Sequence, residues 1–395
     1  MPAVKILFLS QRVPYPPNRG DKISTWRLID RLRQDHEVEV IAFAHDEADK
    51  QGAQDLRKMG FETTVIPLNQ KLRKLLALPL LFTSKALTLG VFGSSQLQAE
   101  VDKRLEWADA AYAFSSSMGA FLVGRGLPWV MHFAELDSDK WKQYAASKPF
   151  PLSAIYRREW RTLLAYERKL AADTVSNVFC TPLEQDIFEE QIPGCPSLVL
   201  RNGVDLEYFQ PQPDKTERAH LVFTGVMDYY PNVDGCVHFV HEVFPLIRAQ
   251  MPDCRFTIVG SRPTAQIQQL AEVGGVSVTG FVEDIRTYLG QATISVAPLR
   301  IARGIQNKVL EAMSSGLPVV GTTSATQGVE GQAGRDFLLA DSVEDQAAAI
   351  LGLLRDPTEA KALGQRGRRF VEQNYNWAET LKPLDGVLDQ LNQQS

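Results

Sequence analysis

The chain alternates short apolar runs with longer amphipathic stretches, and this alternation most restricts its fold. In the first series, apolar runs of strand length lie at residues 4–9, 38–43, 63–66, 110–114, 129–133, 177–180 and 197–200. Stretches with apolar residues at helical spacing lie between several of them, such as residues 22–33 and the longest, 152–172. Such alternation predicts a parallel sheet with helices on both faces.

A second series begins near residue 220. Its apolar runs lie at residues 220–224, 255–259, 276–279, 293–297, 318–321 and 337–339. Helical patterns are found at residues 233–249, 305–314, 343–354, 358–373 and 376–391. Asn376 is expected to cap the last of these helices. The fold class is therefore α/β, with two Rossmann-like, doubly wound domains rather than one long one.

The boundary between the two series is marked by turn-forming residues. Asn202-Gly203 is a turn signal, and Pro211 and Pro213 resist regular structure. We expect a first domain at residues 1–201, a second at 202–375, and a C-terminal helix at 376–395 that returns to the first. Open parallel sheets bind ligands outside the carboxyl ends of their strands. Two such domains facing across a cleft would hold a donor on one side and an acceptor on the other.

Charge and hydropathy exclude some classes of protein. The 42 basic and 47 acidic residues give a net charge of −5, which argues against a general nucleic-acid binder. The apolar run at residues 4–9 is shorter than a signal-peptide core. Another, at residues 75–82, is interrupted by Pro79 and is far below the ~20 residues of a membrane span. We expect a cytoplasmic protein.

Residues 303–320 are the most informative segment, with the pattern of a loop, a helix, a tight turn and a buried strand. Lys308 and Glu311 are three residues apart and share one helical face. Gly304 precedes the helix, whose free N–H groups could bind an anion, and Lys308 adds a positive charge. Glu311 could accept hydrogen bonds from a ribose diol. These features suit a nucleoside diphosphate, and the alternative is an ordinary surface helix with an ion pair.

The same segment resembles a known family. Residues 310–320 are similar to the donor-site motif of glycosyltransferase family 4, whose members have the GT-B fold. Residues 202–205 with Phe209 resemble the family's inter-domain linker, and residues 279–284 the stretch that meets the nucleotide base. The resemblance implies a retaining glycosyltransferase with a UDP- or GDP-linked sugar as co-substrate and no cofactor.

A narrower resemblance concerns three further segments. Residues 10–22, 137–141 and 227–232 resemble the exopolysaccharide glycosyltransferases of bacterial PEP-CTERM/exosortase systems. This likeness implies a role in polysaccharide biosynthesis, with a glycan or lipid-linked acceptor.

The chain also departs from the family pattern. Many members have glutamate where this chain has Arg303, and an arginine and a lysine after the first strand of the second domain. Here Gly225 is followed by Val226, and the lysine region contains Pro231-Asn232. The remaining cations could replace them, or donor binding has been lost. The predicted donor-binding residues are Gly20, Gly225, Arg262, Val282, Arg303, Gly304, Asn307, Lys308 and Glu311.

Two groups in the first domain complete the predicted site. Gly20 would let the backbone approach the reacting groups, or the segment is a plain turn with Asp21 as helix N-cap. An acidic group follows the run that ends at residue 133, and it either faces a ligand or begins a solvated helix. The predicted catalytic residues are Lys308, Glu135 and Asp137, and the predicted acceptor-side residues are Arg19, Asp21, Asp139 and Lys140.

Residues 71–82 mix cations with bulky apolar side chains. One interpretation is an interfacial segment on the anionic inner membrane, which would give peripheral contact. The other is a loop whose apolar half packs on the first domain.

Three functions remain open. The first is glycosyl transfer by front-face displacement, without a covalent intermediate and, since no D-x-D metal site is evident, without an essential metal. The second is isomerisation, because non-hydrolysing nucleotide-sugar epimerases share the GT-B architecture. The third is a non-catalytic sugar-nucleotide-binding protein, which Arg303 would explain.

Overall fold

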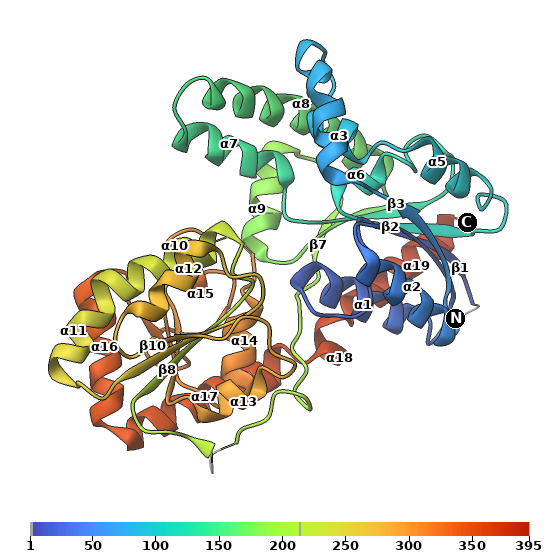
Figure 1. The fold of residues 1–395 in the computed structure, drawn as a ribbon. Helices are drawn as coiled ribbons and strands as arrows, with labels where there is room; N and C mark the ends of the chain where they lie inside the picture. The colour runs from blue at the N-terminus through green and yellow to red at the C-terminus, as the bar shows by residue number, and fades with distance from the viewer. Residues whose placement is uncertain (1–2, 213–214, 303, 395) are drawn as a thin grey trace. The chain divides into compact units, whose positions relative to one another are not determined.

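The computed structural model describes residues 3–212, 215–302 and 304–394. The chain divides into two compact units (Figure 1). The first unit holds Met1–Arg201 and Leu381–Ser395, and the second holds Asn202–Thr380. The chain therefore leaves the first unit once and returns to it after residue 380.

The first unit is built on a seven-stranded parallel sheet with the order β3-β2-β1-β4-β5-β6-β7. All seven expected strands are present. They are β1 (Lys5–Ser10), β2 (Glu37–Ala44), β3 (Glu62–Pro67), β4 (Ala110–Phe114), β5 (Trp129–Ala134), β6 (Ser176–Phe179) and β7 (Ser197–Val199). The order reverses direction at β1 and β4, which makes the sheet doubly wound.

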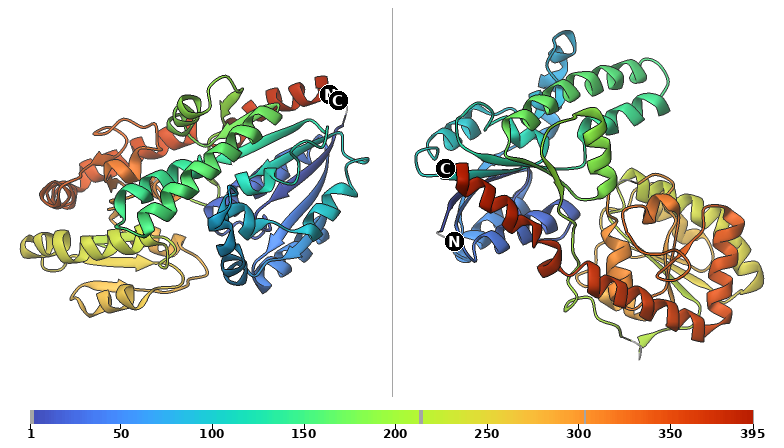
Figure 2. Two further views of the ribbon diagram at one scale, coloured as in Figure 1. Left: turned by 90° about the horizontal axis from the view of Figure 1, so that it is seen from above. Right: turned by 180° about the vertical axis from the view of Figure 1, so that it is seen from behind.

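Helices cover both faces of this sheet. Figures 1 and 2 show α1, α2 and α19 on one face and α5, α6 and α8 on the other. The helical elements are α1 (Gly20–Leu32), α2 (Glu47–Lys58), α3 (Gln70–Ala77), η1 (Leu78–Phe82), α4 (Leu87–Phe92), α5 (Ser95–Asp102), α6 (Ser116–Gly119), α7 (Asp137–Ser147), α8 (Leu152–Asp173), α9 (Pro182–Gln191) and α19 (Pro383–Gln394).

The second unit has a six-stranded parallel sheet with the order β10-β9-β8-β11-β12-β13. Its strands are β8 (His220–Thr224), β9 (Arg255–Val259), β10 (Val276–Val278), β11 (Ile294–Ala297), β12 (Val319–Gly321) and β13 (Leu338–Leu339). Its helical elements are α10 (Tyr230–His238), η3 (Phe239–Val243), α11 (Phe244–Gln250), α12 (Ala265–Gln269), η4 (Leu270–Glu272), α13 (Arg286–Gln291), α14 (Asn307–Ser314), α15 (Thr323–Thr326), α16 (Val343–Arg355), α17 (Pro357–Asn374) and α18 (Trp377–Thr380). The predicted pair of doubly wound α/β domains is confirmed.

Two predicted helices are broken, and each break lies at a proline. The helix expected at residues 233–249 is divided into α10, a π-helical segment and α11, which has Pro245 in its first turn. The helix expected at residues 376–391 is divided into α18 and α19, and Pro383 begins the second part. Proline lacks an N–H and clashes with the preceding turn, so it starts a new helix more readily than it continues one.

Each unit has its own hydrophobic core. The first packs residues such as Leu7, Phe43 and Leu170 together, and the second packs residues such as Phe223, Phe256 and Leu310. Within the described residues, no helix combines the length and the apolar character that a bilayer-spanning segment needs.

Candidate functional site

Two glycines follow neighbouring strands of the second unit. Gly225 comes after β8 and Gly260 after β9. Gly260 has a φ of +154°, and a Cβ on it would lie 1.6 Å from the Gly225 carbonyl oxygen. Because no side chain fits there, the two backbone segments approach each other directly. The predicted donor residue Gly225 therefore lies at the sheet edge where ligands of parallel α/β folds bind.

Lys308 extends from the first turn of α14 toward the end of β8. Its Nζ donates to Asn232 Oδ1 at 2.5 Å and lies 4.4 Å from the centre of the Phe223 ring. Asn232 is 4% exposed, and its Nδ2 donates to the Val226 carbonyl oxygen at 2.9 Å. The lysine ammonium is thus held by a neutral amide and an aromatic face.

The predicted common face of Lys308 and Glu311 on α14 is confirmed, and it lies opposite a buried face. Lys308 and Glu311 are partly exposed, whereas Val309, Leu310 and Met313 are buried. Burial lowers the pKa of Lys308 to about 8, and Glu311 opposes this shift. Burial raises the pKa of Glu311 to about 7, against the effect of Lys308. Two groups that titrate near neutral pH on one helix face are typical of ligand sites.

The loop before α14 also has a constrained backbone. Gly304 has a φ of +62°, and a Cβ on Gly328 would lie 2.4 Å from the Gly304 carbonyl oxygen. Asn307 begins the helix, and its Oδ1 is buried without a hydrogen-bond partner in the described part of the chain. This oxygen could accept a hydrogen bond from a ligand. The predicted donor residue Arg303 lies outside the described residues.

Two further predicted donor residues follow β9 and β10. Arg262 has a φ of +56°, and its Nε lies 3.3 Å from Asp228 Oδ2, in the loop after β8. This arginine is therefore paired with a carboxylate before any ligand binds. Val282 is partly buried and packs against the core of its unit. Both lie on loops at the carboxyl edge of the sheet.

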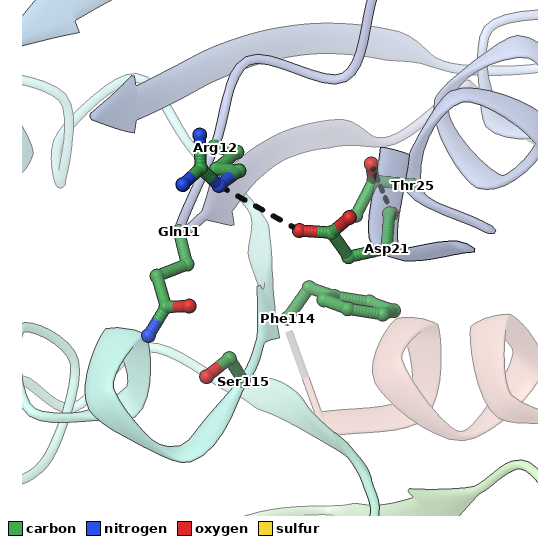
Figure 3. Close-up of a pocket in the computed structure, with 6 residues that line it drawn as sticks. All are labelled: Gln11, Arg12, Asp21, Thr25, Phe114 and Ser115. Carbon is green, nitrogen blue, oxygen red and sulfur yellow. Dashed lines mark hydrogen bonds and ion pairs between the residues drawn. The ribbon is translucent and has the colours of Figure 1, made fainter. Parts of the chain in front are cut away.

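In the first unit, a small pocket lies at the carboxyl ends of β1 and β4 (Figure 3). Its lining residues are Gln11, Arg12, Asp21, Thr25, Phe114 and Ser115. Arg12 Nε lies 3.9 Å from Asp21 Oδ2, and Figure 3 shows the two side chains facing each other across the pocket, with the Phe114 ring beside them. Burial and the nearby Arg19 lower the pKa of Arg12. The pocket combines an arginine, a carboxylate, an amide and an aromatic ring, which suits a polar ligand.

The structure around Gly20 contradicts one of the two interpretations of this segment. Helix α1 begins at Gly20 with Arg19 as the capping residue, so the reading of Asp21 as N-cap is wrong. Asp21 instead accepts a hydrogen bond from Arg19 Nε at 2.6 Å and lines the pocket. Since Asp21 lies within the helix, its side chain is directed to the pocket rather than to the helix end.

The predicted acidic group lies where β5 ends and α7 begins. Asp137 is the first residue of α7, and its Oδ2 accepts from Ser116 Oγ at 2.6 Å. Asp139 is buried, and the side-chain amides of Gln143 and Gln191 donate to its two oxygens at 3.0 and 3.1 Å. These contacts bind Asp139 to the protein itself. Glu135 and Lys140 are partly exposed beside them.

A carboxylic acid that the sequence analysis did not select lies behind this group. Glu167, on α8, is fully buried, and its Oε1 accepts from the Ser138 backbone N–H at 3.2 Å. Burial and the charge of Asp137 raise its pKa well above the usual range. The contact with Ser138 ties Glu167 to the start of α7. His132 is buried in β5, and burial lowers its pKa to about 3.

Other residues of the site could have been found from their position alone. Gln11 and Arg12 follow β1, Ser115 follows β4, and Asn232 lies beyond the end of β8. The rule that places ligands at the carboxyl ends of strands selects these two loops and the first turn of α10, which contains Asn232. Among the described residues, no group of three or more His, Cys, Asp or Glu side chains could hold a metal ion.

Comparison with known proteins relates the second unit to a family. Residues 218–356 match the family described as "Glycosyl transferases group 1". The phosphatidyl-myo-inositol mannosyltransferase of Propionibacterium freudenreichii is 28% identical over 194 residues, which are 47% of this chain and 48% of that protein. The chain spans about half the length of the curated relatives that it matches.

Solved structures resemble the whole chain. The sucrose-phosphate synthase of Thermosynechococcus elongatus has a TM-score of 0.70 at 16% identity, over 99% of this chain and 100% of that one. Anabaena HepE, solved in complex with UDP and glucose, has a TM-score of 0.70 at 16% identity, over 98% and 99% of the two chains. These likenesses, with the two parallel sheets, show the GT-B fold.

Proposed function

We propose that this protein is a glycosyltransferase that binds a nucleotide-diphosphate sugar through its second unit. The observation that carries the proposal is the Lys308 ammonium at the end of β8, with Glu311 on the same face of α14. Both residues lie inside the segment that matches the glycosyl transferases. A cation beside a helix start suits a diphosphate, and a carboxylate three residues on suits a ribose.

In the proposed reaction, the bond between the sugar C1 and the diphosphate oxygen breaks, and a bond from C1 to the acceptor oxygen forms. The acceptor attacks C1 from the face that the diphosphate leaves, so the configuration at C1 is retained without a covalent intermediate. The acceptor proton passes to the leaving diphosphate. Lys308 stabilises the negative charge that develops on the diphosphate. Glu311 holds the ribose and so positions the donor. Asp21 and Arg12 are the proposed acceptor contacts in the first unit.

The nucleotide is proposed to be UDP or GDP. Several curated relatives are named as GDP-mannose-dependent mannosyltransferases, whereas Anabaena HepE was solved with UDP. We propose a glycan or lipid-linked acceptor in exopolysaccharide or cell-surface polysaccharide synthesis.

A thermal-shift panel of UDP- and GDP-linked sugars tests donor binding, because a ligand that binds only the folded state raises its melting temperature. Glu311→Ala should then weaken the calorimetric affinity for the stabilising nucleotide sugar by at least about tenfold. Glu344→Ala, which removes an exposed glutamate from α16, is the matched control and should leave the affinity unchanged. An unchanged affinity in Glu311→Ala would remove Glu311 from the site.

Product analysis separates transfer from the two other functions. A transferase should release the nucleoside diphosphate only when an acceptor extract is present. An epimerase would change the sugar without any acceptor, and a non-catalytic binding protein would release no nucleotide under either condition.

Peripheral contact with the cytoplasmic face of the membrane is the second part of the proposal, and α3 with η1 supports it. These elements expose Leu75 to 65% and Phe82 to 93%. The side chains of Lys71 and Lys74 are exposed on the same short helix. Exposed leucines beside lysines suit an anionic lipid surface. The segment is helical rather than a loop, although Ala77 and Leu80 do pack on the core of the first unit, as the alternative interpretation expects.

Two side chains of α8, Glu159 and Arg158, hold this segment and the residues that follow it. Glu159 is 1% exposed and accepts from the backbone N–H groups of Leu87 and Thr88 at 2.7 and 2.9 Å. Arg158 donates to the carbonyl oxygens of Leu80, within η1, and Lys85 at 2.5 and 2.9 Å. The exposed leucines are therefore presented on an anchored segment.

Vesicle co-sedimentation tests this contact. The protein should bind vesicles that contain anionic lipid and not neutral vesicles, and Lys71→Glu/Lys74→Glu should abolish the binding. The control Lys50→Glu/Lys58→Glu reverses two exposed charges on α2 and should leave it unchanged. Equal binding of the vesicles by the two double variants would refute the proposed membrane contact of α3 and η1.

A further inference from the structure

The Asn232 side chain is used on both of its polar atoms. Its Oδ1 accepts from Lys308 Nζ at 2.5 Å, and its Nδ2 donates to the Val226 carbonyl oxygen at 2.9 Å. The donation fixes which atom faces the lysine, because only the amide oxygen can then accept from the ammonium. With 4% of its surface exposed, Asn232 cannot turn away without breaking both bonds.

The neighbouring groups restrict the position of the Lys308 ammonium. A Cβ on Gly225 would lie 2.7 Å from Asn232 Nδ2 and 3.3 Å from Lys308 Nζ. The Phe223 ring lies 4.4 Å from the same nitrogen. A lysine side chain has four rotatable bonds, and fixing it is costly in entropy unless several contacts share the task. Here the Asn232 amide, the Phe223 ring and the backbone at Gly225, which has no side chain, hold the ammonium in place before any ligand binds.

The amide oxygen holds the ammonium without neutralising it. Cys236 from α10 and Glu311 from α14 are the titratable groups that act on this amine. Burial keeps Cys236 neutral, because it raises the pKa of the thiol. Glu311, whose pKa burial raises to about 7, is incompletely charged near neutral pH. The charge of the protonated Lys308 is therefore only partly offset within the protein.

We propose that Asn232 is the positioning residue of the donor site: a neutral acceptor that fixes the Lys308 ammonium at the end of β8 and leaves its charge for the diphosphate of the nucleotide sugar. This inference rests on the proposed function. A carboxylate at residue 232 would pair with the Lys308 ammonium and compete with the diphosphate for it. The neutral amide of Asn232 therefore leaves Lys308 able to attract the diphosphate.

Asn232→Asp tests the inference, because it keeps the shape of the side chain and adds the competing charge. Calorimetry would compare the binding of UDP with uridine, and of GDP with guanosine, to the wild-type protein and the variant. We expect the affinity for the bound diphosphate to fall at least about tenfold, with the affinity for its nucleoside unchanged. Asn374→Asp, on α17 in the same unit, adds the same charge at an exposed position and should leave both affinities unchanged.

Asn232→Ser covers the case in which the aspartate variant does not fold, because its hydroxyl is neutral and too short to bridge both partners. We expect the same selective loss of diphosphate affinity. In a Lys308→Met background the serine substitution should have no further effect, since no ammonium remains to be positioned. A merely structural role of Asn232 would lower nucleoside affinity as well and would be additive with Lys308→Met.

The outcomes separate the inference from the function on which it rests. A wild-type protein that binds neither nucleoside diphosphate would refute both. A wild-type protein that binds one of them, with Asn232→Asp or Asn232→Ser binding it as tightly, would leave the proposed function standing and overturn the role of Asn232.

Discussion

Two lysines, one in each unit, are held in opposite ways. In the first unit, Lys22 Nζ lies 2.7 Å from Asp49 Oδ1, and the two side chains are 5% and 1% exposed. In the second unit, the contact of Lys308 Nζ is with an amide oxygen. A buried charge with an ionised partner contributes to the fold, whereas a charge held by a neutral group remains able to attract an anion. The difference indicates which lysine is structural and which can serve a ligand.

The partner of Lys22 has further structural contacts. Asp49 Oδ2 accepts from the His45 backbone N–H at 2.9 Å and lies 3.4 Å from Arg12 Nη1. Asp49 therefore ties the loop after β2 to the start of α1 and to the loop after β1. The first unit uses its buried charges to hold two loops and the start of a helix together.

The largest expected effect would break the first half of this comparison. Asp49→Ala leaves Lys22 buried without its counter-charge, so the free energy of unfolding should fall by about 3–5 kcal/mol in urea denaturation. Asp55→Ala, which removes a partly exposed carboxylate from the same helix, is the control and should change stability little. A loss no larger than that of the control would mean that the ion pair is not structural.

A smaller effect tests the second half. Lys308→Met keeps the length of the side chain and removes the charge, so the affinity for the bound nucleoside diphosphate should fall about 10–100-fold by calorimetry. The free energy of unfolding should fall less than in Asp49→Ala, because the group left without its partner is a neutral amide oxygen and not a buried charge. Lys361→Met, at an exposed position of α17, is the control. Unchanged diphosphate affinity would place the lysine among the structural groups.

The strands could be predicted because each is a short apolar run between turn residues, and all thirteen lie where the pattern indicates. The two faces of α14 followed from helical spacing, which needs no knowledge of the neighbouring elements. The helix breaks at Pro245 and Pro383 also had a local signal, which the periodicity of the flanking residues obscured.

The partners of the charged residues could not be predicted. Lys308 is 76 positions from Asn232 in sequence, and only the sheet order that places α10 beside α14 brings them together. Likewise, Asp21 has the sequence pattern of a helix cap, but the helix begins two residues earlier than that cap would allow, and the carboxylate faces Arg12. Spacing along one helix is a local property, whereas the pairing of residues from two elements depends on the fold.

The smallest expected effect sharpens the comparison through pH. Since burial lowers the pKa of Lys308 to about 8, the protonated fraction falls about tenfold between pH 7 and pH 9. The diphosphate affinity should fall by about the same factor. Over this interval Glu311, with its pKa raised to about 7, becomes ionised, so the nucleoside affinity should not fall. Calorimetry at the two pH values measures both, and a diphosphate affinity that stays flat would show that the lysine proton is not used.

The chain enters and leaves the second unit at neighbouring positions, and this affects whether the unit can fold alone. The Val204 backbone N–H donates to the Tyr375 carbonyl oxygen at 2.8 Å, so the two ends of the second unit are adjacent. A domain whose two ends are adjacent can be inserted into another domain, or removed from it, without distorting the backbone of that other domain. Residues 202–380 should therefore fold as an excised domain, and joining residues 201 and 381 by a short linker should restore a continuous host.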